Sequence, residues 1–216
     1  MALIAMAKSG KTFEPIPEDQ HLARCVLVAD IGTHDGKYGL QRQCIIGWEL
    51  PEVRRTFDAD KGEEPAMISR FLTLSLSEKA SLRELLEQWR GRAFTADELA
   101  GFDVLQVLGV PCLLQITHTT ANDQVRAKVA TVSKLHKSIT CPPQEIPSRK
   151  FALTDGTVDE LEALPEWIQQ KIQASVEYDA WLTSALNRRG GTADQTEPVQ
   201  QTLLEVERGP DGDQPF

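Results

Sequence analysis

The alternation of apolar and polar residues divides most of the chain into short stretches that predict strands. Residues 24–31 place β-branched and apolar side chains at alternating positions, which is typical of a strand. A turn cluster with two glycines, Gly32 and Gly36, follows. A second alternating stretch then runs from Lys37 or Tyr38 to residue 50, where Pro51 is expected to end it. These two stretches predict a long hairpin.

Three further strands are predicted, at residues 66–76, 111–117 and 125–135. A charged connection at residues 52–65 leads into the first of them, and a polar turn at residues 118–124 joins the last two. In the last strand polar and small residues alternate with apolar ones, so one of its faces is basic (Arg126, Lys128 and Ala130 against Val125, Ala127 and Val129).

A helical insert lies between the third and fourth strands. Ser77 is expected to be the N-cap of a helix that Gly91 ends, with its apolar residues on one face (Leu82, Leu85, Leu86 and Trp89). Thr95 and Glu98 have the spacing of a capping box, which predicts a second short helix. The resulting order is three strands, a helical insert and two strands.

This order of elements is that of the OB-fold, a five-stranded Greek-key barrel. A general α+β sheet with helices on one side has the same order, and the sequence is compatible with both. We favour a mainly β, OB-like body with a helical insert at residues 22–140. Four flanking segments are predicted. Residues 1–21 form an N-terminal arm, and residues 141–157 form a Pro-rich link that includes a short strand at 151–153. Residues 158–186 form a helical segment broken at Pro165, and residues 187–216 form a disordered acidic tail. The helical segment could cap the barrel or form a homo-oligomer.

The negative charge is concentrated in the C-terminal third. The 216 residues carry a net charge of −9, but residues 22–140 have 15 basic and 15 acidic residues. Residues 151–216 have 4 basic and 13 acidic residues. A neutral body can still present one basic face, so the overall charge does not argue against nucleic-acid binding.

Cysteine spacing and hydropathy indicate the compartment. The four cysteines form no C-x-x-C pair, which fits reduced thiols better than a zinc site or disulfides (Cys25, Cys44, Cys112 and Cys141). No stretch approaches the roughly 18 apolar residues of a membrane span, and the first residues lack a signal-peptide pattern. We expect a cytoplasmic protein with no cofactor or metal and no membrane contact.

Single-stranded nucleic acid is bound by basic side chains that meet phosphates and by aromatic rings that stack on bases. The candidates for these roles in the body are Lys37, Tyr38, Arg42, Trp48, Arg54, Arg55, Phe57, Arg70, Arg126, Lys128, Lys134 and Lys137.

An enzyme is the less favoured interpretation. Catalytic or metal-binding patterns such as H-E-x-x-H and C-x-x-C are missing from the body, and no phosphate-loop pattern is complete. Asp30, Asp35 and Glu49 remain as carboxylates that a nuclease would use. We therefore expect a protein that is not an enzyme.

The last six residues suggest a contact with another protein. Asp211 and Asp213 precede Pro215 and Phe216, so an aromatic ring and its α-carboxylate could enter a small basic pocket of a partner. This end resembles the acidic Pro-Phe tip of bacterial single-stranded DNA-binding proteins, which recruits replication and repair enzymes. Gly212 and Gln214 depart from the fuller acidic run of that tip.

Several segments of the body resemble a family of bacteriophage-encoded proteins taken to be OB-fold single-stranded DNA-binding proteins. They are residues 47–51 (GWELP), 71–79 (FLTLSLSEK), 86–95 (LEQWRGRAFT) and 101–103 (GFD) followed by Leu108 and Gly109. The resemblance spans about residues 22–140, and it carries no motif of DNA-contacting residues. It implies a protein of phage DNA replication or recombination in an infected bacterial cell. The alternative is an interaction module that engages host replication or repair proteins through the tail without binding DNA.

Overall fold

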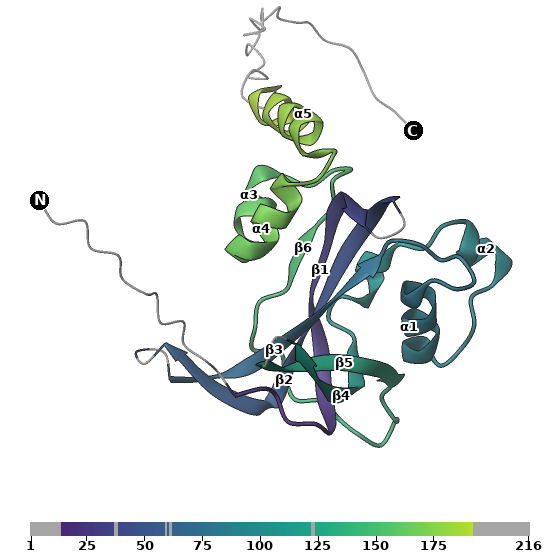
Figure 1. The fold of residues 1–216 in the computed structure, drawn as a ribbon, viewed down its shortest axis with the longest axis vertical. Helices are drawn as coiled ribbons and strands as arrows, with labels where there is room; N and C mark the ends of the chain where they lie inside the picture. The colour runs from purple at the N-terminus through teal and green to yellow at the C-terminus, as the bar shows by residue number, and fades with distance from the viewer. Residues whose placement is uncertain (1–13, 37–38, 59, 61, 122–123, 192–216) are drawn as a thin grey trace, which may run out of the picture.

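The computed structural model describes residues 14–36, 39–58, 60, 62–121 and 124–191, and it is mainly β (Figure 1). The strands are β1 (Gln20–Gly36), β2 (Gly39–Asp58), β3 (Gly62–Thr73), β4 (Pro111–Ala121), β5 (Gln124–Lys134) and β6 (Arg149–Phe151). The helices are α1 (Ser81–Arg90), α2 (Ala96–Ala100), the 3-10 helix η1 (Val104–Val107), α3 (Val158–Glu162), α4 (Glu166–Gln173) and α5 (Tyr178–Gly191).

All strands belong to one sheet. Their order is β3-β2-β1-β4-β5, with antiparallel pairing, and β6 adds to β1 in parallel. The two edge strands, β3 and β5, come within contact distance of each other, yet in the described part of the chain no backbone ladder joins them. The sheet is therefore open, and the predicted α+β class with a helical insert between the third and fourth strands is confirmed.

Strand β1 is the element to which most others attach. It pairs with β2 from Arg24 to Gly36, with β4 from Gln20 to Arg24, and with β6 at residues 27–29. The pairing with β2 shifts twice, so Val26 and Ile31 are extra residues in β1. Such bulges bend a strand and increase its twist, which lets β4 and β6 share the same edge of β1.

Both faces of the central strands are buried, and each face has its own core. Alternate residues of β1 and β2, such as Val28 and Ile46, face a first core that α1 covers. The residues between them, such as Leu27 and Ile45, face a second core that β6 and α3–α5 cover. Figure 1 accordingly shows α1 and α2 on one side of β1 and α3–α5 on the other.

The helical insert packs as the sequence predicts, but its first cap differs. The four apolar residues predicted for α1 are buried (Leu82, Leu85, Leu86 and Trp89). Gly91 ends the helix with a φ of 69°. The N-cap is Ala80, which makes no side-chain cap hydrogen bond, so the prediction of Ser77 is wrong. Ser77 instead bonds locally with Ser75. The capping box of Thr95 and Glu98 is confirmed at the start of α2.

The second strand continues past the proline that was expected to end it. Between Leu50 and Arg54 the pairing of β2 with β3 shifts, and Pro51 falls within this irregular stretch, where its missing N–H removes no regular ladder bond. Most of residues 52–65, predicted as a charged connection, therefore form the outer part of the β2–β3 hairpin. Most of the predicted polar turn at residues 118–124 likewise belongs to strands, because β4 continues to Ala121.

The C-terminal segment has three helices where the sequence predicts two. The break at Pro165 is confirmed, and a second break separates α4 from α5 at residues 174–177. Helix α5 continues to Gly191, so the predicted start of a disordered tail at residue 187 is too early. The rest of the predicted tail, residues 192–216, lies outside the described residues. The short strand predicted at residues 151–153 is observed slightly earlier, as β6.

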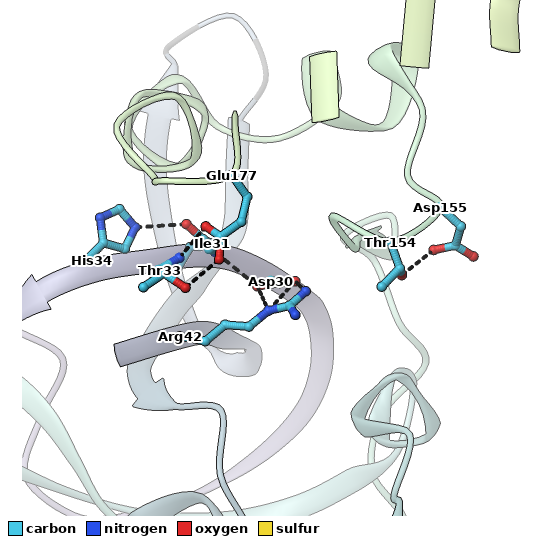
Figure 2. Close-up of polar contacts among 9 residues, drawn as sticks. Asp30, Ile31, Thr33, His34, Arg42, Thr154, Asp155 and Glu177 are labelled. Carbon is cyan, nitrogen blue, oxygen red and sulfur yellow. Dashed lines mark hydrogen bonds and ion pairs between the residues drawn. The ribbon is translucent and has the colours of Figure 1, made fainter. Parts of the chain in front are cut away.

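A set of polar contacts fixes the turn before α5 to β1 (Figure 2). The Glu177 carboxylate accepts hydrogen bonds from the Thr33 backbone N–H, at 2.8 Å, and from the Thr33 hydroxyl. The Val176 N–H donates to the Thr33 carbonyl at 3.1 Å. Burial would raise the pKa of Glu177, but the hydrogen bonds from Thr33 and the charge of Arg42 outweigh it and lower that pKa. We call this set of contacts the Thr33–Glu177 latch.

Gly32 is required where the latch meets β1, because it has a φ of 80° and the Ser175 side chain lies against it. A Cβ at this position would lie 2.4 Å from the Ser175 Cβ. We expect Gly32→Ala to lower the free energy of unfolding by about 3 kcal/mol or more, the sum of a left-handed backbone and a steric overlap. Chemical denaturation of the purified full chain measures this loss.

The control is Gly39→Ala, because Gly39 also has a positive φ, 87°, but has no atom within 4 Å of the added Cβ. It should cost only the backbone term, about 1–2 kcal/mol. Adding Ser175→Gly to Gly32→Ala should recover part of the loss. Equal losses in the two alanine variants would contradict the proposed close contact.

Candidate nucleic-acid interface

The basic face predicted for the fifth strand is present. Arg126 and Lys128 are exposed on β5, opposite Thr119 and Thr117 of β4. The residue between them, Ala127, packs against the first core. The alternation therefore points the two cations away from the core.

The β4–β5 hairpin has the largest excess of positive charge in the body. Residues 111–137 contain four basic residues and one acidic residue, Asp123. Besides Arg126 and Lys128, the cations are Lys134 and Lys137, both exposed. Lys134 lies near the end of α1, where its Cδ would be 3.4 Å from a Cβ at Gly91. Three of these cations thus lie on β5, and Lys137 follows it.

The β2–β3 hairpin is less favourable for phosphates than the sequence suggested. Its Arg54 pairs with Glu145 at 2.6 Å and also donates to the Glu63 carbonyl. Residues 52–65 include three basic and five acidic residues. Arg55 is half-buried opposite Glu64. This hairpin therefore has no excess of positive charge.

Phe57 lies at the mouth of a pocket of about 490 Å³ between this hairpin and the link to β6. The pocket is lined by Pro65 and Met67 of β3, by Pro147 of the link and by Arg149 of β6. Phe57 is 39% exposed, so part of the residue is accessible to solvent, which a ring that stacks on bases requires.

Two other arginines of the predicted set do not point freely outward. Arg42 is paired with Asp30, with its Nε 3.1 Å from Oδ2, as Figure 2 shows. Arg70 is half-buried and lies opposite Ile46, on the side of β3 that faces the first core. Lys37 and Tyr38, at the tip of the β1–β2 hairpin, lie outside the described residues.

Trp48 is a core residue, which corrects the prediction that it contacts bases. Its side chain is 0% exposed, and its ring centroid lies 5.8 Å from that of Trp89 in the first core. The alternation along β2 placed Trp48 on one face of the strand, but it could not tell that α1 covers this face.

The sequence did not identify the most exposed aromatic pair. Phe71 on β3 and Trp167 on α4 lie in edge-to-face contact and are 45% and 46% exposed. Phe71 lies in the segment predicted as a strand (66–76), and Trp167 lies in the segment predicted as helical (158–186). The one available signal was the alternation of β3, which places Phe71 on the opposite face from Ile68 and Leu72.

A second pocket, of about 490 Å³, lies beside Lys134, but its arginines are already paired. Arg90 and Arg92 both bind the Glu98 carboxylate, and the Arg92 contacts measure 2.7 and 2.9 Å. The Arg90 guanidinium also lies 4.4 Å from the ring centroid of Phe94. These cations stabilise the helical insert, and Lys134 adds the unneutralised charge of the pocket.

Two of the three carboxylates considered for a nuclease have structural partners, and the third, Asp35, is exposed. Glu49 is fully buried and accepts the backbone N–H groups of Glu145 and Ile146, while Asp30 pairs with Arg42. Within the described ranges, no group of three or more His, Cys, Asp or Glu side chains is placed to hold a metal ion.

The four cysteines are free and buried. Burial raises the pKa values of Cys25 and Cys44 to about 12, so these thiols stay protonated at neutral pH. Among the residues that the structure describes, no helix has the length and apolar character needed to cross a membrane. The partner-binding residues predicted at the C-terminal tip lie outside those residues (Asp211, Asp213, Pro215 and Phe216).

No protein-family model matches this chain, and no curated protein matches its sequence.

The paired charges around α2 predict an acid-dependent loss of stability. Hydrogen bonds from Arg92, from the Thr95 backbone and from Arg90 lower the pKa of Glu98 to about 2, against 4.5 as its ordinary value. A lowered pKa stabilises the fold fully above pH 4.5, and this contribution is lost as the pH falls from there towards 2. We expect the wild type to lose more stability than Glu98→Gln between about pH 6 and about pH 3.

Denaturant titration at the two pH values measures the difference. Leu99→Ala changes the same helix without removing a charge, so it should keep the pH dependence of the wild type. If the stability of Glu98→Gln depended on pH as that of the wild type does, the lowered pKa of Glu98 would not be the cause of the acid-dependent loss.

Proposed function

We propose that the protein binds single-stranded DNA without sequence preference, through a surface centred on the β4–β5 hairpin. The observation that carries this proposal is the charge of residues 111–137, the hairpin and the three residues after it. They include four basic residues and one acidic residue, whereas the rest of the body (22–110 and 138–140) has 11 basic and 14 acidic residues. A basic surface that follows the phosphates is the first requirement of such a site.

The strand order supports an OB-like arrangement. An OB barrel that is opened between its third and fifth strands has the strand order β3-β2-β1-β4-β5. As in that barrel, α1 lies between β3 and β4 in the sequence, and β3 comes near β5. In OB-folds the face of strands 2 and 3 and the loops between strands 1 and 2 and between strands 4 and 5 bind oligonucleotides. The basic hairpin here contains the last of these loops.

We further propose that residues 211–216 recruit replication or repair proteins in an infected bacterial cell, as the resemblance implies. Two aspartates beside Pro215 and Phe216 suit a basic pocket with an apolar floor. The same acidic segment, tethered to the body, would compete with DNA for the basic hairpin.

The double variant Arg126→Ala/Lys128→Ala tests the proposed surface. Binding of the full chain to a fluorescent thirty-base oligo-dT should weaken with salt, and the variant should lose affinity. Its slope of log K against log salt should be shallower by about 1.4, since each phosphate contact on a single strand contributes about 0.7.

The control is Lys79→Ala/Lys150→Ala, which changes the net charge equally at two exposed lysines outside the hairpin, of which Lys150 lies 3.7 Å from the Glu160 carboxylate. It should leave the slope close to that of the wild type. An unchanged slope in the hairpin variant would show that Arg126 and Lys128 do not contact the phosphates of the bound DNA. The absence of oligo-dT binding at low salt would refute the proposal and leave the tail-dependent interaction module as the alternative.

Removing the tip tests the role of the tail separately. A chain that ends at Pro210 should bind oligo-dT as well as the full chain or more tightly, because two acidic residues are lost. Fluorescence titration at low salt measures both forms. Weaker binding by the shortened chain would contradict a separate role for the tip.

A further inference from the structure

Phe71 and Trp167 form an exposed aromatic pair from two distant parts of the chain. Their ring centroids are 5.9 Å apart, and the ring planes meet at 73°. Phe71 belongs to β3 and Trp167 to α4. Neither ring fills a core, because nearly half of each remains accessible to solvent.

Both rings are held on rigid supports. Phe71 lies opposite Ile45 of β2, which is fully buried in the second core. Trp167 is followed by Ile168, which is fully buried in the same core, as is Ile172 one turn further along α4. The Thr33–Glu177 latch fixes the end of the turn that follows α4. Binding to these rings therefore requires little ordering of the chain.

The surroundings of the pair carry hydrogen-bonding groups and a cation. The positions of β2 and β3 that share the face of Phe71 and lie nearest to it are uncharged (Gln41, Gln43, Ser69 and Thr73 with Ile45 and Met67). Glu49, opposite Met67 on the same face, is a fully buried carboxylate. On α4, Gln170 and Lys171 are exposed one turn after Trp167. The nearby Glu166 accepts a hydrogen bond from Gln170. This chemistry suits a nucleobase, which offers a flat face, polar edges and a neighbouring phosphate.

The small size of the patch argues against a second copy of the chain as its occupant. An aromatic side chain buries 150–250 Å² when it is covered, so two half-exposed rings offer about 200 Å². A stable protein interface needs about 800 Å² from each partner. The patch is large enough for one or two stacked bases.

We propose that the Phe71–Trp167 pair stacks on unpaired bases of the bound strand, so that the C-terminal helical segment is part of the nucleic-acid interface. This rests on the proposed binding of single-stranded DNA. The pair supplies what the β4–β5 hairpin lacks, because no aromatic residue occurs in residues 111–137. Stacking also gives a preference for single strands, since the stacking of neighbouring base pairs in a duplex covers the faces of the bases.

The test uses the full chain and two oligonucleotides of about thirty units, oligo-dT and an abasic strand of the same length. Trp167→Ala should weaken binding to oligo-dT about 5- to 100-fold, the range that alanine substitution of a stacking ring gives. Phe71→Ala should act in the same direction, and Trp167→Phe should keep most of the affinity. The salt dependence should stay that of the wild type, because no phosphate contact is removed. The abasic strand should bind equally to the wild type and to Trp167→Ala.

Intrinsic fluorescence gives a second readout. Of the four tryptophans, Trp167 is 46% exposed and the other three are at most 4% exposed. Oligo-dT should therefore quench the fluorescence of the wild type, and this change should disappear in Trp167→Phe. The abasic strand should quench much less.

Leu186→Ala is the matched control, because Leu186 is a half-exposed apolar residue of α5 outside the pair. It should change neither the affinity nor the quenching, and circular dichroism should show that all variants are folded. Salt-sensitive binding that is unchanged in Trp167→Ala, without quenching in the wild type, would overturn the stacking and leave the proposed function intact. A wild type that binds no oligo-dT would overturn both. A dimer that Trp167→Ala dissociates, with unchanged DNA affinity, would assign the pair to a second copy instead.

Discussion

The burial of both faces of β1 is the constraint on which the rest of this structure depends. A strand that faces solvent on one side alternates apolar and polar residues, whereas residues 25–31 of β1 are all buried. The sheet must therefore be covered twice, by α1 on one side and by β6 with α3–α5 on the other. The bulges at Val26 and Ile31 make this possible, because they bend β1 so that β4 and β6 can both pair with its free edge.

The second covering layer ties the C-terminal segment into the body. The link after β5 is not a loose connection, since its backbone N–H groups bind the buried Glu49 carboxylate and β6 pairs with β1. A buried carboxylate that accepts backbone N–H groups is strongly held. Separating it from these N–H groups would leave a buried charge without hydrogen bonds, which costs free energy. The start of the C-terminal segment is thus anchored to the sheet, and Ile168 and Ile172 bury one side of α4 in the second core.

Ion pairing decides which cations remain for a ligand. Arg42, Arg54 and the two arginines beside Glu98 are engaged by carboxylates of the chain itself, although their positions along the sequence look as accessible as those of Arg126 and Lys128. The β4–β5 hairpin keeps an excess of positive charge because Asp123 is the only acidic residue in residues 111–137, although the exposed Glu18 also lies beside β4, where its carboxylate accepts the His118 backbone N–H. Local composition was therefore a better guide to the basic surface than single residues were.

The sequence by itself determined the order of the elements, the apolar face of α1, the capping box at Thr95 and the outward side of β5, because each depends on neighbours within a few residues. It failed at Pro51, where a change of register with β3 accommodates the proline inside a strand, and pairing between strands is not a local property. Only the tertiary structure decided which rings are exposed. Trp48 and Trp167 both occupy apolar positions of regular elements. Helix α1 covers Trp48 and leaves it no accessible surface, whereas Trp167 extends beyond the edge of its core. Periodicity assigns a side chain to a face, and the packing of distant segments determines whether that face is covered.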